Sequence, residues 1–414
     1  MKSSGSARWL LVAVCLSLVT IPSSFGWGNK GHKIVNKLGA QSLPADVPAF
    51  LRTPEAISEI EYLGPEPDRW RSRAEPELSA EQAPDHFIDL ELANLISPLP
   101  KRRYDFIAAA YAYIAAHPTE AQAMRPERIG FQPWITEEVW ERLKSAMRDY
   151  RTLSAQPGAD TKPVEAAILF YAGWLGHYVG DGSQPLHTTV NYDGWVGKEN
   201  PNGYTTEHGI HSKFESTFVD AAVNEGDVQP LLTPIRTIGD EWDDYLAYLR
   251  HTNSLVEKVY QLDKAHGFDG SGTPEAKQFT AERLAAGASM LRDLIVAAWV
   301  KSAEPVPEWK SENDAPNPNA NKPAGAEVTV LVKFTLDEQG HATNIRIAHS
   351  TDTRFNDRAA EIIRNAPYQP VKHRGEPVQV EMKVTVRFQK GSTPSTEPSG
   401  TSQINPKTDV TAID

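Results

Sequence analysis

The chain of 414 residues contains a single cysteine, Cys15. That residue lies in an N-terminal apolar stretch that we expect to be removed, so the mature chain would contain no cysteine. Such a chain forms no disulfide and offers no thiolate to a metal ion. A metal site in the mature chain would therefore depend on histidine and carboxylate side chains.

Positive charge is also scarce. The chain has 42 Lys and Arg residues against 54 Asp and Glu residues, which gives a formal net charge of −12. A protein that binds nucleic acid by electrostatics alone would be basic. An anionic substrate would therefore have to be held by something local, such as bound metal cations.

Long apolar runs are absent beyond the N-terminus. The stretch WLLVAVCLSLVTI follows two basic residues and is too short to span a bilayer comfortably. Ser24 and Gly26 then occupy the −3 and −1 positions of a cleavage site before Trp27. We therefore expect a signal peptide over residues 1–26, a secreted or periplasmic protein, and no transmembrane segment in the mature chain. The alternative is an uncleaved anchor helix.

Residues 27–303 carry the pattern of helices and almost no strand alternation. Thr136 is a plausible N-cap for one of these helices, and Thr273 with Pro274 starts another. The predicted helices cover 102–117, 135–153, 164–181, 239–262 and 273–302. The helix over 164–181 is apolar nearly all round, which indicates a central, buried helix. We expect an all-helical domain.

The composition changes at residue 304. Residues 304–325 are rich in proline and asparagine and are typical of a linker. Alternating apolar residues predict a small α+β domain of ββαβ order over residues 326–390. Its strands lie at 327–336, 343–350 and 378–388, with a helix within 352–366. The polar tail, residues 391–414, is expected to be disordered.

Two short segments carry the chemistry. In GHYVGDGSQPLH, His177 and Asp181 are one helical turn apart and share one face of the helix. Pro185 ends that helix, so His187 can face a different ion. HGIHSKFE repeats the arrangement, because His211 and Glu215 are again four residues apart.

Histidine and carboxylate ligands without cysteine suit zinc in a catalytic site. Two zinc ions about 3.5–4 Å apart are the usual apparatus for in-line attack on a phosphate ester. The alternative is a set of unrelated surface histidines and solvated carboxylates. However, His177 and Asp181 lie in an apolar helix, where burying them unpaired would cost several kcal/mol. We therefore predict a metal site.

The segment GHYVGDGSQPLH resembles the HxxGDxxQPxH motif of the zinc-dependent phosphodiesterases. This family comprises single-strand-specific nucleases of the mung bean and fungal type and bacterial zinc phospholipases C. The resemblance extends over roughly residues 27–300 and includes WGNKGHKIV at the mature N-terminus. It implies that Trp27 binds zinc through its freed α-amino nitrogen and its carbonyl oxygen, together with His32. The alternative is that Trp27 is an ordinary aromatic residue at a helix start.

The resemblance also implies the remaining ligands and three zinc ions. PDHFIDLE makes His86 a ligand, and GPEPDRWRS makes Asp68 the carboxylate, with Asp85 as its rival. The implied groups are Asp68, His86, His177 and Asp181 for the first ion, His187, His211 and Glu215 for the second, and Trp27, His32 and a bridging Asp181 for the third. Asp68 and Asp181 are also the candidate catalytic carboxylates.

Substrate choice divides this family. In its nucleases a base stacks on the aromatic after the ligand histidine and bonds an aspartate two residues later, which here are Phe87 and Asp89. Such stacking contributes about 1–3 kcal/mol per base. The alternatives are a core Phe87 and a solvated Asp89. Trp195 and Tyr204 are further candidates for contact with substrate.

Other features resemble the phospholipases. Glu215 stands where the fungal nucleases have aspartate, and their Gly-Gly-Asn segment is missing between His187 and His211. We predict a secreted zinc-dependent endonuclease that prefers single-stranded DNA or RNA. The alternatives are a zinc-dependent phospholipase C and a non-catalytic zinc-holding adaptor that binds a partner through its C-terminal domain.

Residues 326–390 are similar to the TonB C-terminal domain. The similarity includes a turn at Gly340, Ser350 at the end of a strand, FNDRAAEIIR as the helix, and YQPVKHRGEPV before the last strand. It implies contact with a periplasmic or outer-membrane protein, through the exposed edge of the last strand. The alternative is an accessory module that only solubilises or spaces the enzyme.

Overall fold

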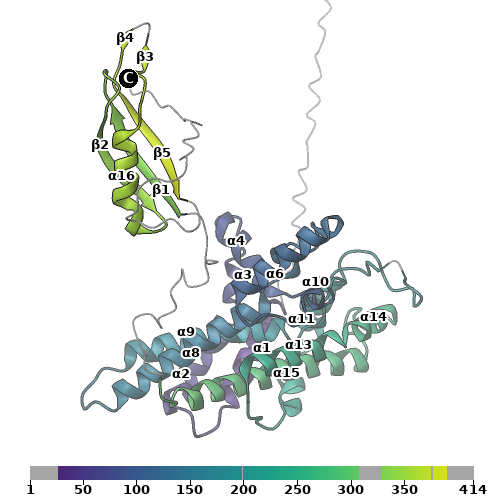
Figure 1. The fold of residues 1–414 in the computed structure, drawn as a ribbon. Helices are drawn as coiled ribbons and strands as arrows, with labels where there is room; N and C mark the ends of the chain where they lie inside the picture. Colours follow the sequence, from purple (N-terminus) through teal and green to yellow (C-terminus); the bar gives the residue numbers. More distant parts are fainter. Residues whose placement is uncertain (1–26, 198, 307–327, 374–375, 389–414) are drawn as a thin grey trace, which may run out of the picture. The chain divides into compact units, whose positions relative to one another are not determined.

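The computed structural model describes residues 27–197, 199–306, 328–373 and 376–388. The chain divides into two compact units, residues 1–305 and 306–414 (Figure 1). Three predicted features fall outside the described residues: the signal peptide over 1–26, the tail over 391–414, and nearly all of the linker over 304–325.

The first unit is built of helices, as the sequence predicts (Figure 1). Its α-helices are α1 Gly28–Gln41, α2 Pro54–Leu63, α3 Glu66–Arg69, α4 Pro76–Gln82, α5 Leu90–Ala93, α6 Arg103–Ala116, α7 Pro126–Ile129, α8 Gln132–Ser154, α9 Lys162–Asp181, α10 Ile210–Ser212, α11 Val219–Ala222, α12 Glu225–Val228, α13 Glu241–Asn253, α14 Val256–Lys264 and α15 Pro274–Lys301. Short 3₁₀ segments and one π-helical segment join several of them.

Local side chains explain where these helices begin. The Thr273 side chain accepts a hydrogen bond from the Ala276 amide, with Pro274 in the first turn of α15. The prediction for α8 was wrong by one turn, because Pro133 starts this helix earlier. Thr136 therefore lies inside α8, and its hydroxyl donates to the Gln132 carbonyl.

The single helix predicted over 239–262 is two helices, α13 and α14. The chain leaves the helical path at Ser254 and Leu255. The Ser254 hydroxyl donates to the His251 carbonyl over 2.6 Å, which competes with the backbone pattern of a continuing helix. This break brings α14 under the loop that precedes α10, where the Tyr260 hydroxyl donates to the Asn191 carbonyl.

Helix α9 is the centre of the unit, since it packs against α1, α2, α8 and α15 (Figure 1). Two apolar clusters surround it. Tyr178 and Val179 of α9 belong to the first cluster, while Ile210 and Phe214, next to the second predicted metal segment, belong to the other. Each of the two predicted metal-binding segments is therefore held in place by neighbouring residues that pack into a different apolar cluster.

The second unit has the predicted ββαβ order. Antiparallel strands β1 Val328–Leu336, β2 Ala342–Ser350 and β5 Val380–Phe388 form a sheet in the order β2-β1-β5. Helix α16 Asn356–Asn365 packs on β1 and β2. A short hairpin of β3 Lys372–His373 and β4 Glu376–Pro377, which the sequence did not predict, precedes β5.

Candidate metal centre

Helix α9 delivers the first two side chains at its C-terminal end. His177 and Asp181 are fully buried, and 3.3 Å separates His177 Nε2 from Asp181 Oδ2. The other ring nitrogen of His177, Nδ1, lies 2.8 Å from the Gly64 carbonyl oxygen. Because Nδ1 is held by the backbone, Nε2 is the nitrogen that faces Asp181.

His187 lies beyond the end of α9. The Gln184 side chain accepts a hydrogen bond from the Leu186 amide and turns the chain after Asp181. His187 Nδ1 lies 2.7 Å from the His86 carbonyl oxygen. Its Nε2 consequently faces Glu215 Oε2 at 3.4 Å.

His211 and Glu215 meet across a turn that is wider than an α-helical turn. His211 belongs to α10, and Glu215 belongs to a π-helical segment, Lys213–Phe218. Such segments are rare and frequent at functional sites. His211 Nε2 lies 2.8 Å from Glu215 Oε2 and 3.2 Å from His187 Nε2. Burial opposes the shift, but the Glu215 carboxylate leaves the pKa of His211 raised.

Three side chains from other elements join α9: His32 of α1, Asp68 of α3, and His86. His32 Nε2 lies 3.4 Å from Asp181 Oδ1 and 3.8 Å from Asp68 Oδ2. His86 Nδ1 lies 3.1 Å from Asp181 Oδ2 and 3.0 Å from His177 Nε2.

The orientation of His86 differs from that of the other histidines. Its Nε2 lies 2.8 Å from the side-chain oxygen of Gln82, so Nδ1 is the nitrogen that faces Asp181. Asp85, the rival carboxylate, is directed elsewhere, with its Oδ1 3.8 Å from Arg103.

Three groups of buried side chains can each hold a metal ion. They are His32, Asp68 and His177; His86, His177 and Asp181; and His187, His211 and Glu215. The last group is the one predicted for the second ion. The other two divide the residues differently from the expected groups, since His32 lies with Asp68 and His177. Asp181 is nevertheless central, because its Oδ1 lies 3.4 Å from His32 and 3.7 Å from His187.

The donor atoms of this cluster fit divalent cations. Both ring nitrogens of His32, both carboxylate oxygens of Asp68 and Asp181 Oδ1 are buried without a hydrogen-bond partner. Buried polar atoms without partners are costly, and bound cations would satisfy the carboxylate oxygens and one ring nitrogen of His32.

The protonation states of the histidines in this cluster also favour metal binding. Burial lowers the pKa values of His32 and His86 well below their usual range, and that of His177 to about 4. These imidazoles are therefore neutral, which is the form that binds metal. Burial, with neighbouring carboxylates adding to it, raises the pKa values of Asp68 and Asp181, and a bound cation would stabilise their charged forms.

Trp27 is fully buried beside the end of α9. Its Nε1 donates to the Gly180 carbonyl and to the Ser183 hydroxyl, each at 2.8 Å. These bonds hold residue 27 next to Asp181. Zinc binding by its α-amino group requires cleavage after Gly26, which lies outside the described residues, so this role stays a prediction.

A pocket of about 440 Å³ opens beside the cluster, and His86, His187 and His211 line it. Phe87 and Asp89 line the same pocket. Burial, with Glu91 nearby, raises the pKa of Asp89 to about 7. The pocket also contains residues that the sequence reasoning did not select, namely Arg71, Arg128 and Tyr192. Arg71 stands in the same GPEPDRWRS segment as Asp68, which is the signal that could have identified it.

Trp195 and Tyr204 do not line this pocket. Their rings pack together at 5.1 Å and against Tyr260, and Tyr204 is buried. These two side chains form part of the second apolar cluster and its border, and their contact with a substrate stays a prediction. His208 is largely exposed beside Asp193 and belongs to none of the three groups.

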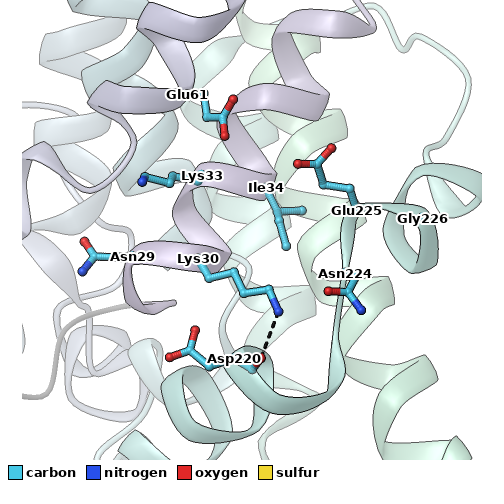
Figure 2. Close-up of a pocket in the computed structure, with 9 residues that line it drawn as sticks. All are labelled: Asn29, Lys30, Lys33, Ile34, Glu61, Asp220, Asn224, Glu225 and Gly226. Carbon is cyan, nitrogen blue, oxygen red and sulfur yellow. Dashed lines mark hydrogen bonds between the residues drawn. The ribbon is translucent and has the colours of Figure 1, made fainter.

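A second cavity, of about 540 Å³, lies along α1 (Figure 2). Lysines and acidic residues surround it, and Lys30 donates to the Asp220 carbonyl. None of the predicted ligands lines it. The pocket beside the cluster is therefore the candidate substrate site.

Part of the chain matches one known protein family. Residues 317–389 match the family of the Gram-negative bacterial TonB protein C-terminal. No curated protein matches the chain.

Two solved structures are similar over most of the chain. An alpha-toxin of Clostridium perfringens from an avian strain is 12% identical with a TM-score of 0.33, over 89% of this chain and 93% of that chain. The alpha toxin from Clostridium absonum is 11% identical with a TM-score of 0.33, over 89% of this chain and 85% of that chain. At these TM-scores the similarity supports no functional inference. No helix among the described residues is long and apolar enough to cross a membrane.

Proposed function

We propose that the helical unit is a zinc-dependent phosphodiesterase. The observation that carries this proposal is the convergence of buried imidazoles and carboxylates, among which atoms of His32, Asp68 and Asp181 have no hydrogen-bond partner. Hydrolysis of a phosphodiester is the reaction that such a cluster of neighbouring divalent ions commonly serves. The motif resemblance over residues 27–300 supports the same chemistry.

We propose three zinc ions. His187, His211 and Glu215 hold one ion. His32, Asp68, His86, His177 and Asp181 share the other two, and Trp27 joins His32 after signal cleavage. Asp68 and Asp181, as the carboxylates between the imidazoles, are the proposed catalytic residues.

The protein groups around the cluster have separate roles in this proposal. Bound zinc would supply polarisation of a phosphoryl oxygen and a lowered pKa of water. The backbone carbonyls of Gly64, His86 and Tyr192 orient His177, His187 and His211. Arg71 and Arg128 line the pocket, where guanidinium groups can donate to the phosphate oxygens of a substrate.

The structure supports both candidate substrates. A nucleic acid fits the expected stacking on Phe87 and bonding to Asp89, both of which line the pocket. A phospholipid fits at least as well, because Leu92, Leu186 and Ala123 make much of the same lining apolar. Glu215 and the net charge of −12 also favour the phospholipid. The nuclease therefore stays a prediction beside phospholipase C.

The test is to assay the purified mature protein on single-stranded DNA, RNA and phosphatidylcholine, with and without a chelator, after elemental analysis. Chelator-sensitive cleavage of a polynucleotide assigns a nuclease, and release of phosphocholine assigns a phospholipase C. Full zinc occupancy without turnover of any phosphodiester would assign the non-catalytic adaptor. Absence of bound transition metal would refute the proposal as a whole.

We propose further that the second unit binds a protein partner in a periplasmic setting, which the TonB C-terminal match favours. Strand β5 is an edge of the sheet, so its outer backbone groups are available to a partner strand. N-terminal sequencing of the secreted protein tests the location, because a periplasmic or secreted form would begin at Trp27.

A further inference from the structure

Helix α6 presents an apolar surface to solvent. Tyr104, Ala108, Tyr111, Ala112 and Ala115 are exposed, and their spacing of four, three, one and three residues places them along one side of the helix. Tyr104 is 77% exposed and Tyr111 is 51% exposed. We call these five residues the α6 face.

The opposite side of α6 anchors it firmly. Phe106 and Ala110 are fully buried, and the Phe106 ring stacks on Trp134 of α8 with the centroids 4.1 Å apart. The helix is therefore fixed in place with its apolar α6 face outward. Helix α13 shows the usual arrangement, because its exposed positions include Asp243 and Arg250.

Two elements on which α6 packs lie at the candidate substrate pocket or next to a residue that lines it. Helix α6 packs on α7 and on the 3₁₀ segment Asn94–Ile96. Arg128 of α7 and Leu92, two residues before that segment, line the pocket. Leu95, within the segment, is a further exposed apolar side chain, at 48% exposure.

The charges around the α6 face indicate which surface it would meet. Lys101 and Arg102 precede the helix and are more than half exposed, and each forms a surface ion pair, with Asp240 and with Asp105 of the first turn of α6, that a lipid phosphate would have to replace. The chain as a whole carries −12, which opposes binding to a polyanion or to an anionic bilayer. Tyrosine rings and basic side chains are typical of segments that lie in the interface of a bilayer.

We propose that the α6 face, together with Leu95, docks the protein on a zwitterionic phospholipid surface. The tyrosine rings would enter the headgroup region, while Lys101 and Arg102 would contact lipid phosphates. The pocket lined by Leu92 and Arg128 would then stand beside the lipid that it receives. The inference rests on the proposed function, in which a phospholipid is one of the two candidate substrates.

The test uses the mature protein with phosphatidylcholine vesicles in a sedimentation assay. Tyr104→Glu/Tyr111→Glu and the single variant Ala108→Glu place charge on the α6 face, and Val300→Glu places the same charge at an exposed apolar residue of α15. We expect the double variant to bind vesicles at least about tenfold more weakly than wild type. Ala108→Glu should weaken binding less, and Val300→Glu should leave it unchanged.

A soluble phosphodiester, bis(p-nitrophenyl) phosphate, separates docking from catalysis. All four proteins should hydrolyse it equally, while only the α6 variants lose hydrolysis of vesicles. Failure of zinc-loaded wild type to hydrolyse the soluble ester would refute the proposed function, whatever the result with vesicles. Absence of vesicle binding by wild type, or equal binding by the double variant, would overturn the docking surface. Loss of single-strand oligonucleotide binding or of self-association in the double variant, with no change in vesicle binding, would also overturn it.

Discussion

The two units of this protein bury different kinds of side chains. Among residues 328–372 and 377–388, the buried side chains are apolar, as in the row Val330, Val332, Phe334 and Leu336 of β1. The helical unit has apolar cores too, but it also buries five histidines and three carboxylates in one cluster. The described part of the second unit buries no charged side chain, whereas the first contains a region whose burial opposes folding unless a cation is present.

This contrast separates residues that make the fold from residues that make the site. A buried carboxylate without a partner destabilises the folded state by several kcal/mol, so its presence needs a reason outside packing. Both carboxylate oxygens of Asp68 and Oδ1 of Asp181 meet that description, and no carboxylate in the described part of the second unit does. Each of the following substitutions should affect only one of the two units.

The largest effect is expected from His177→Ala, which removes the imidazole shared by two of the three ligand groups. Loss of metal should lower phosphodiesterase activity at least about 10³-fold, because the ions stabilise several kcal/mol of transition-state charge. Zinc content by elemental analysis and hydrolysis rates provide the measurement. His251→Ala, at an exposed histidine of α13, is the matched control. Retention of full zinc and activity in His177→Ala would contradict the assignment.

Phe334→Ala should destabilise the second unit and leave the stability of the helical unit unchanged. Phe334 is 1% exposed in the core of the sheet, and this kind of truncation costs about 3–5 kcal/mol. Amide hydrogen exchange should accelerate across β1 and β2, while zinc content and hydrolysis stay at the wild-type level. Lys333→Ala changes the neighbouring exposed residue and should alter neither. A fall in zinc content with Phe334→Ala would show that the two units are not independent.

Gln82→Leu removes the acceptor that orients His86. Loss of such a supporting hydrogen bond typically lowers metal affinity about 10–100-fold, so competition with a chelator should reveal earlier zinc release. Gln82→Glu keeps an oxygen at this position and should restore most of the affinity. Equal zinc release from wild type and Gln82→Leu would mean that packing alone positions His86.

The smallest effect is expected at Glu137 of α8, an acid outside the cluster. Burial, with Glu241 and Glu141 nearby, raises its pKa to about 8 from a usual value of 4.5. Its contribution to stability is therefore present below about pH 4.5 and is lost as the pH rises through about 8. Relative to wild type, the Tm of Glu137→Gln should rise between pH 5 and pH 9 by no more than about 4 °C. A constant difference in Tm across this range would contradict the raised pKa.

Much of the fold could be predicted because its patterns are local. Alternation in residues 328–336 predicts β1, and the apolar character of 164–181 predicts the central helix α9. Predictions failed where a side chain competes with the backbone. Ser254 ends α13 inside an uninterrupted helical pattern, and Thr136 lies within a helix that Pro133 had already started.

The sequence by itself determined the pair His177 with Asp181, because spacing along one helix decides which side chains share a face, and the same spacing indicated His211 with Glu215, which meet across a π-helical turn. It also determined that these ligands are imidazoles and carboxylates, since the expected mature chain has no cysteine. Only the tertiary structure decided that Asp68 rather than Asp85 lies at the cluster, that His32 lies with Asp68 and His177, and that the apolar side of α6 faces outward. The reason is that residues on different elements meet only through the packing of those elements, which no spacing along the chain encodes.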